Sequence, residues 1–224
     1  RGRSKQEYLR QVRKLGMQYP ERSLKQISER MVFDHLIHLR DKEKLRPSTL
    51  NQAVVALRMF YRDYLERDWQ LWEQFEIRRD QPLPMVLTRD EVHQLMGAVR
   101  ENRFKAVLAL IYHCGLRVGE AVRLRPKDID GKRGMLRVID GKGGRNREVP
   151  VAPQMIERLR GYWCFHRNAH WLFPGVGRGW KERSRTLQAA MAAATEPMSV
   201  SSVQAALRVV VPAARIKKSA TCHT

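Results

Sequence analysis

Apolar residues recur at helical spacing through the first third of the chain, where they predict one face of several short helices. Ser23 ahead of Leu24 is typical of a helix start, and so is the Pro47-Ser48-Thr49 sequence. The spacing therefore predicts a bundle of three or more helices between residues 5 and 65. Its apolar positions are Tyr8, Leu9, Val12, Leu15, Met31, Val32, Leu36, Leu39, Leu50, Val54, Leu57, Phe60 and Tyr61.

The helical pattern is lost between residues 73 and 86, where Pro82 and Pro84 lie among charged residues. Such a stretch is typical of a linker between two domains. We place the boundary near residue 81, which gives an N-terminal helical domain at 1–80 and a second domain at 81–224.

The second domain begins with Thr88 and Glu91, which form a T-x-x-E capping box ahead of an apolar helix. A longer helix is expected over 104–113, closed by Gly115. Residues 135–151 change to strand-like spacing around a glycine-rich tip that carries Lys142, so they predict a β-hairpin. Helices resume over 153–162 and 199–214. The expected fold class is mainly α with a small antiparallel β-sheet.

The charge of the chain indicates an acidic partner. Its 224 residues carry 43 Lys plus Arg against 23 Asp plus Glu, a formal net charge of +20. The excess is +6 over residues 1–80 and +14 over residues 81–224. Nucleic acid is the usual partner of such a protein, so we expect double-stranded DNA, contacted mainly by the second domain.

The same composition argues against other classes. Three scattered cysteines, Cys114, Cys164 and Cys222, are too few for a disulfide framework or a paired metal motif. No apolar run approaches the roughly 18 residues of a membrane span. We therefore expect a cytoplasmic protein without a metal, a cofactor or a membrane partner.

Five sequence landmarks give the chain a resemblance to a known family. The central one is Cys114-Gly115-Leu116-Arg117-Val118-Gly119-Glu120, which resembles the G-L-R-x-x-E box of the tyrosine recombinases, or phage integrases. The others follow that family's order, and they are Leu83-Pro84-Met85-Val86-Leu87-Thr88, Gly141-Lys142-Gly143-Gly144 with Val149-Pro150, Trp171-Leu172-Phe173-Pro174 and Thr221-Cys222-His223-Thr224.

The resemblance extends to the N-terminal half, where the helix after Pro47 looks like the family's SAM-like core-binding domain. It therefore covers essentially the whole chain, and it leans toward integron or mobile-element integrases. It implies a helical core-binding domain followed by an α+β catalytic domain that is truncated at its C-terminus.

The chemistry implied by the family is attack of a tyrosine hydroxyl on a DNA phosphodiester. Arg117 would stabilise the charge that builds on the nonbridging oxygens, since a guanidinium offers paired hydrogen bonds. Lys142 would protonate the leaving 5′ oxygen. His223 would begin the H-x-x-R box and assist proton transfer or bind the phosphate, while Glu120 would support the arginine from behind.

Each assignment has a structural alternative. Arg117 could simply cap helix carbonyls, and Glu120 could pair on the surface with Arg123 or Lys127. Lys142 could be an ordinary solvated loop lysine, and His223 rests on a two-residue match at a chain end. Tyr112 and Tyr162 are interpreted as packing residues rather than nucleophiles, as are the tryptophans. Other basic residues could contact phosphate in place of Lys142, namely Lys132, Arg133, Arg145 and Arg147.

The sequence ends at Thr224, before the positions of the family's second arginine and its tyrosine. On this basis we expect that the chain alone does not cleave DNA and that self-assembly on DNA is weakened. A noncatalytic DNA-binding or regulatory module is the alternative function. A strand-relaxing enzyme related to eukaryotic-type topoisomerases is a third, against which the N-terminal helical domain argues.

Overall fold

The computed structural model describes residues 2–75, 85–139, 146–218 and 220–222. The chain separates into two compact units, Arg1–Leu83 and Pro84–Thr224. The boundary predicted near residue 81 falls outside the described residues, so it stays a prediction.

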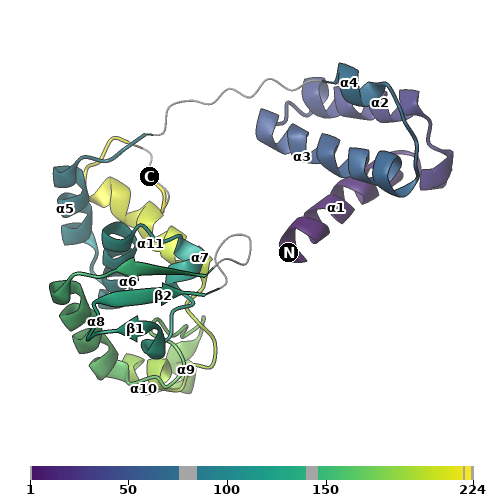
Figure 1. The fold of residues 1–224 in the computed structure, drawn as a ribbon. Helices are drawn as coiled ribbons and strands as arrows, with labels where there is room; N and C mark the ends of the chain where they lie inside the picture. Colours follow the sequence, from purple (N-terminus) through teal and green to yellow (C-terminus); the bar gives the residue numbers. More distant parts are fainter. Residues whose placement is uncertain (1, 76–84, 140–145, 219, 223–224) are drawn as a thin grey trace. The chain divides into compact units, whose positions relative to one another are not determined.

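The first unit is entirely helical in its described part (Figure 1). Two of its helices run on directly into wider, π-helical turns. In chain order the elements are α1 (Gly2–Gln18), the 3-10 turn η1 (Leu24–Gln26), α2 (Glu29–Ile37) with the π-helical η2 (His38–Lys42), α3 (Pro47–Arg58) with the π-helical η3 (Met59–Tyr64), and α4 (Leu71–Gln74).

The helix starts of this unit differ in part from those expected. The second helix begins at Glu29, and its cap is Ser28, whose hydroxyl accepts a hydrogen bond from the Met31 amide at 3.4 Å. Ser23 precedes only η1. Pro47 opens α3 as predicted. The Ser48 and Thr49 side chains, which we interpreted as capping residues of this helix, do not cap it, because the cap position is Arg46. The sequence predicted a helix start at Ser23 and not at Ser28, which lies five positions later.

One hydrophobic core holds the first unit together, and α1 packs mainly against α3. Tyr61 is completely buried, and its hydroxyl donates to the Leu24 carbonyl at 2.9 Å. Trp69 stacks between the rings of Tyr61 and Trp72. The interpretation of Trp69 and Trp72 as packing residues is therefore confirmed, since both belong to this core.

The second unit packs helices around a three-stranded sheet (Figure 1). Its elements are α5 (Arg89–Ala98), α6 (Asn102–Cys114), α7 (Val118–Ala121), the 3-10 turn η4 (Pro126–Asp128), β1 (Ile129–Asp130), β2 (Met135–Val138), β3 (Arg147–Pro150), α8 (Pro153–His166), α9 (Trp180–Arg183), α10 (Leu187–Ala192) and α11 (Val200–Ala213).

The local signals of this unit are confirmed. Thr88 and Glu91 form the reciprocal capping box, with bonds of 3.2 Å and 2.7 Å. Gly115 closes α6 at φ +59°, a left-handed conformation that glycine adopts without a Cβ clash. The sheet is antiparallel in the order β1-β2-β3, and Val138 pairs with Arg147. The mainly helical class with a small antiparallel sheet is thus confirmed.

The segment Trp171–Pro174 contributes packing rather than a full strand. Leu172 and Phe173 are buried, and Phe173 accepts a backbone hydrogen bond from Met198 at 2.7 Å. A single bridge joins Pro174 to Pro197. Through these contacts, the residues just before α11 are attached to a segment whose own side chains lie in the hydrophobic core.

Candidate functional site

Arg117 lies in the short connection between α6 and α7. Gly115 turns the chain at the end of α6, and the residues on either side of Arg117, Leu116 and Val118, are buried in the core. These two buried neighbours fix the backbone, while 52% of the Arg117 side chain remains exposed. The sequence thus presents a charged group to solvent from a rigid position.

Glu120 fixes the position of Arg117 by accepting hydrogen bonds from its backbone and its side chain. Its side chain is only 5% exposed. One carboxylate oxygen accepts the Arg117 backbone amide at 2.9 Å, and the other accepts a guanidinium hydrogen of Arg117 at 3.1 Å. The alternative partners Arg123 and Lys127 are wrong: Arg123 donates instead to the Gly119 carbonyl, and no ion pair of Lys127 occurs in the described chain.

Arg147, the first residue of β3, is the second partner of Glu120. Its two terminal nitrogens donate to the two carboxylate oxygens, at 3.0 Å and 2.7 Å. This fork geometry is the strongest arrangement available to a guanidinium and a carboxylate. We define Arg117, Glu120 and Arg147 as the Arg–Glu–Arg cluster.

The cluster keeps Glu120 ionised. The hydrogen bonds from Arg147, and next those from Arg117, lower the pKa of Glu120 from 4.5 to about 2, although its burial alone would raise it. The same contact raises the pKa of Arg147. At neutral pH the cluster therefore carries two positive charges and one negative charge.

This arrangement leaves Arg117 able to bind an anion. A guanidinium has five N–H donors, and Glu120 uses one of them. No hydrogen bond from the Arg117 side chain to a carbonyl occurs within the described residues, so the carbonyl-capping alternative receives no support there. Among the described residues, the other donors of this half-exposed side chain have no partner, so they can donate to a phosphate.

Lys142 and His223 lie outside the described residues, as does Arg145. Of the other basic residues considered, the strand register shows that Arg147 lies at one end of the hairpin and that Lys132 and Arg133 lie at the other end. Arg147 pairs with Val138 at the end of the hairpin that leads to its tip, whereas Lys132 and Arg133 lie in the turn at the other end of β2. Four strand residues separate the two ends by about 10 Å. In Figure 1, α7 lies beside the tip end of β2 and β3.

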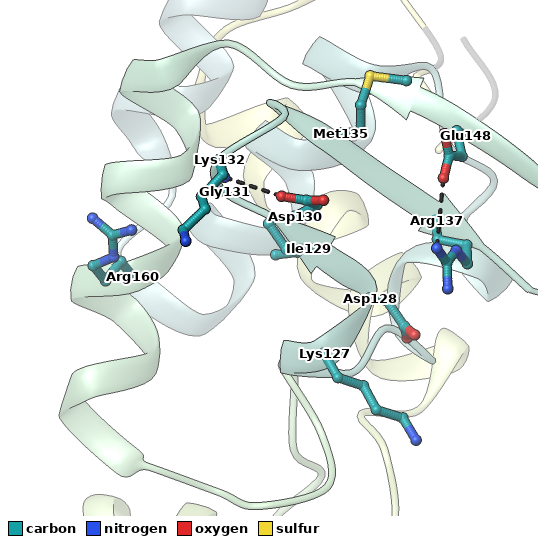
Figure 2. A pocket seen from close by; sticks show the side chains of 10 residues that line it. All are labelled: Lys127, Asp128, Ile129, Asp130, Gly131, Lys132, Met135, Arg137, Glu148 and Arg160. Atoms are coloured by element: carbon teal, nitrogen blue, oxygen red, sulfur yellow. Dashed lines mark hydrogen bonds and ion pairs between the residues drawn. The ribbon is translucent and has the colours of Figure 1, made fainter.

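Lys132 instead lines a hollow of about 460 Å³ beside β1, together with side chains of β2 and β3 (Figure 2). Glu148 lines it and pairs with Arg133 at 3.2 Å and Arg137 at 3.7 Å. Asp130 accepts the backbone amides of Lys132 and Arg133. These carboxylates neutralise part of the local charge, so the hollow is a mixed surface distinct from the Arg–Glu–Arg cluster.

The two tyrosines considered as nucleophiles differ. Tyr162 packs against Phe173 and His166, and burial raises the pKa of its phenol, so it is confirmed as a packing residue. Tyr112 is 51% exposed and meets the His113 ring edge-on. Its interpretation as a packing residue is therefore wrong, because half of its side chain is exposed and it does not belong to the core.

Two further features are absent from the described residues. No group of three or more His, Cys, Asp or Glu side chains stands close enough to hold a metal ion in that part of the chain. Among the same residues, no helix has the length and apolar character needed to cross a membrane.

Sequence reasoning missed Arg147 as a partner of Glu120. It identified Arg147 only as one of several basic residues near the hairpin tip. The pairing spans 27 positions of sequence, and it depends on β3 beginning beside α7. No spacing rule gives this contact. The available signal was a glutamate in an apolar neighbourhood, which requires a positively charged partner.

Comparison with known proteins identifies the family. The family model for the phage integrase family matches residues 85–224, and that for the phage integrase N-terminal SAM-like domain matches residues 1–71. The chain belongs to the phage integrase family.

Individual relatives agree with this assignment. A Sinorhizobium fredii protein, provisionally named integrase/recombinase y4qK, is 41% identical over 144 residues, which are 64% of this chain and 47% of the relative. Tyrosine recombinase XerA of Thermococcus kodakarensis is 34% identical over 130 residues, 57% of this chain and 45% of its own. The chain therefore spans about half the length of these curated relatives.

The fold is also that of a solved structure. The crystal structure of a lambda integrase dimer bound to a COC′ core site covers 96% of this chain and 60% of its own, with a TM-score of 0.70 and 16% sequence identity. At this identity the likeness concerns the fold.

Proposed function

We propose that the chain is the DNA-binding and phosphate-activating part of a site-specific tyrosine recombinase. The observation that carries the proposal is the Arg–Glu–Arg cluster, which presents a half-exposed Arg117 from a buried carboxylate within the region matched by the integrase family. Its partner is double-stranded DNA in the cytoplasm, as the net charge of +20 favours. Protomers assemble on that DNA, and the lambda integrase of similar fold, which was solved as a dimer bound to a COC′ core site, supports this assembly.

The proposed reaction exchanges one phosphoester for another. The hydroxyl oxygen of a tyrosine forms a bond to phosphorus while its proton passes to solvent. The bond from phosphorus to the 5′ oxygen breaks, and that oxygen takes a proton from Lys142 and leaves as a hydroxyl. Arg117 donates hydrogen bonds to the nonbridging oxygens as their charge increases. Glu120 and Arg147 act as positioning residues, and His223 assists proton transfer or binds the phosphate.

The nucleophile of this reaction is not assigned within the 224 residues. The resemblance implies a tyrosine after the H-x-x-R box, and the matching segment here runs from Thr221 to Thr224. We therefore propose the cleavage step for the chain together with the region that follows this box in its relatives.

Two assays test the proposal. The 224-residue chain should select a duplex site from a random pool, and its affinity should fall steeply with salt, since phosphate contacts dominate it. A nicked version of that site should then trap a covalent adduct with the chain fused to the following region of the Sinorhizobium relative. The same fusion carrying Arg117→Ala should bind DNA but form at least about a hundredfold less adduct.

The outcomes separate the alternatives. Binding without an adduct in the fusion would favour a noncatalytic DNA-binding module and overturn the catalytic proposal. Failure to bind duplex DNA at low ionic strength would overturn both. Arg208→Ala is the matched control, since it removes another exposed arginine of the second unit at a distance along the chain from the cluster.

A further inference from the structure

A cavity of about 1220 Å³ opens on the second unit between α5, α6, α8 and α10. Its floor is apolar and includes three methionines, Met96, Met155 and Met191, together with Leu159. These helices can be followed in Figure 1. Neither Arg117 nor Arg147 lines this cavity, so it is separate from the Arg–Glu–Arg cluster.

The size and chemistry of the floor indicate what it fits. Small-molecule clefts commonly measure about 300–1,000 Å³. This cavity is larger, and methionine side chains are flexible and polarizable, which suits them to binding apolar peptide side chains of varied shape. A helix laid into a groove is the usual form of such recognition.

The rim of the cavity is basic. Four exposed cations stand around it, Arg89, Arg100, Lys105 and Arg158, and none has an ion-pair partner among the residues that the structure describes. The single acidic residue of the lining, Glu101, is already paired with Arg103 at 2.7 Å. An occupant that meets both surfaces must be apolar on one side and negatively charged along its edges.

This charge pattern selects among occupants. A second copy of the chain would bring a net charge of +20 to a rim that is already positive. A DNA duplex would satisfy the rim but would leave the apolar floor without a matching surface. An amphipathic helix with acidic flanks satisfies both.

We propose that this cavity is a docking site for an acidic amphipathic helix of a partner protein. The occupant would lie along α6, the helix whose end leads through Gly115 to Arg117. A partner bound there would leave Arg117 uncovered, because Arg117 does not line the cavity. The proposal stands on the cavity and its rim, and it does not depend on the recombinase function.

The test uses a synthetic peptide of about 18 residues, with leucines at helical spacing on one face and glutamates on its flanks. A peptide of the same composition in shuffled order is the control for charge and hydrophobicity. The protein is the 224-residue chain labelled at its methionine methyl groups. The designed peptide should bind at least about tenfold more tightly than the shuffled one, and it should shift the methyl signals of Met96, Met155 and Met191.

Internal and matched controls make the result specific. Met17 and Met59 lie in the first unit and are 81% and 45% exposed, so their signals should not move. Arg100→Glu combined with Lys105→Glu should weaken peptide binding at least about tenfold. Arg208→Glu combined with Lys217→Glu makes the same charge change at exposed positions outside the cavity, and it should change the affinity less than about twofold.

Three results would overturn the proposal. The first is equal binding of the designed and shuffled peptides. The second is binding that shifts other methionines but leaves the three cavity methyl groups unmoved. The third is a short duplex that shifts these three methyl groups and displaces the peptide, which would assign the cavity to DNA.

Discussion

Replacing Glu120 with glutamine removes the charge of a buried carboxylate while keeping its shape, so it tests the Arg–Glu–Arg cluster directly. The pKa of Glu120 is lowered from 4.5 to about 2. A shift of this size corresponds to about 3 kcal/mol of extra stability for the ionised form. The side chains of Arg117 and Arg147 are 52% and 37% exposed, and solvent screens part of that energy. We expect the free energy of unfolding near pH 7 to fall by about 2 kcal/mol.

The pH dependence gives the sign of the effect. Because the folded-state pKa of Glu120 is depressed, its stabilising contribution is complete above pH 4.5 and is lost as the pH falls toward about 2. The wild type and Glu120→Gln should therefore differ most at neutral pH and converge in acid. Calorimetry should show the unfolding transition of the second unit lowered by about 5 °C near pH 7.

A matched control separates this cluster from ordinary surface pairs. Glu157 pairs with Arg160 on α8 at the same i,i+3 spacing as Glu120 and Arg117, but its side chain is 66% exposed. Glu157→Gln should cost less than about 0.5 kcal/mol. The reasoning is refuted if Glu120→Gln costs no more than this control near pH 7, or if its deficit is undiminished near pH 2.

Three further predictions concern the second unit. Thr88→Ala removes the side-chain acceptor of the Glu91 amide, and we expect urea unfolding to show a loss of about 1 kcal/mol, whereas an unchanged midpoint would contradict the capping box. Gly115→Ala places a Cβ at φ +59° and should cost about 1 kcal/mol by the same measurement; a stabilised variant would contradict this conformation. The Tyr162 hydroxyl is buried without a hydrogen-bond partner in the described part of the chain, so Tyr162→Phe should not lower the melting temperature, and a clear decrease would reveal a bond there.

Local sequence rules predicted most elements of the fold. The Thr88–Glu91 capping box and the glycine at the end of α6 act within four residues, so their outcome depends little on the rest of the chain. The same rules failed between Ser23 and Ser28. Both serines precede helical turns, but Ser23 leads only into the 3-10 turn η1, whereas Ser28 caps α2.

For the candidate site, the sequence predicted only the contact between residues that are close together in the chain. Arg117 and Glu120 belong to one motif and do contact each other. The sequence predicted that Arg147 lies near the hairpin tip, but not that it contacts Glu120. That contact forms only because β3, the returning strand of the hairpin, begins beside α7. The prediction that Tyr112 is a packing residue was wrong for a similar reason. A helix that is apolar by composition still has an exposed face, and only the packed structure shows which residues lie on it.

Because Glu120 binds two arginines, it would keep one charged partner if the other moved away. Were an incoming phosphate to draw the Arg117 guanidinium away, Glu120 would still hold both oxygens on Arg147 and the Arg117 amide. The buried carboxylate would then keep a positively charged partner. Arg117 would therefore change partners without the large loss in the free energy of unfolding that follows when a buried charge is left unpaired. A site built in this way can release its ligand and return to the same starting geometry.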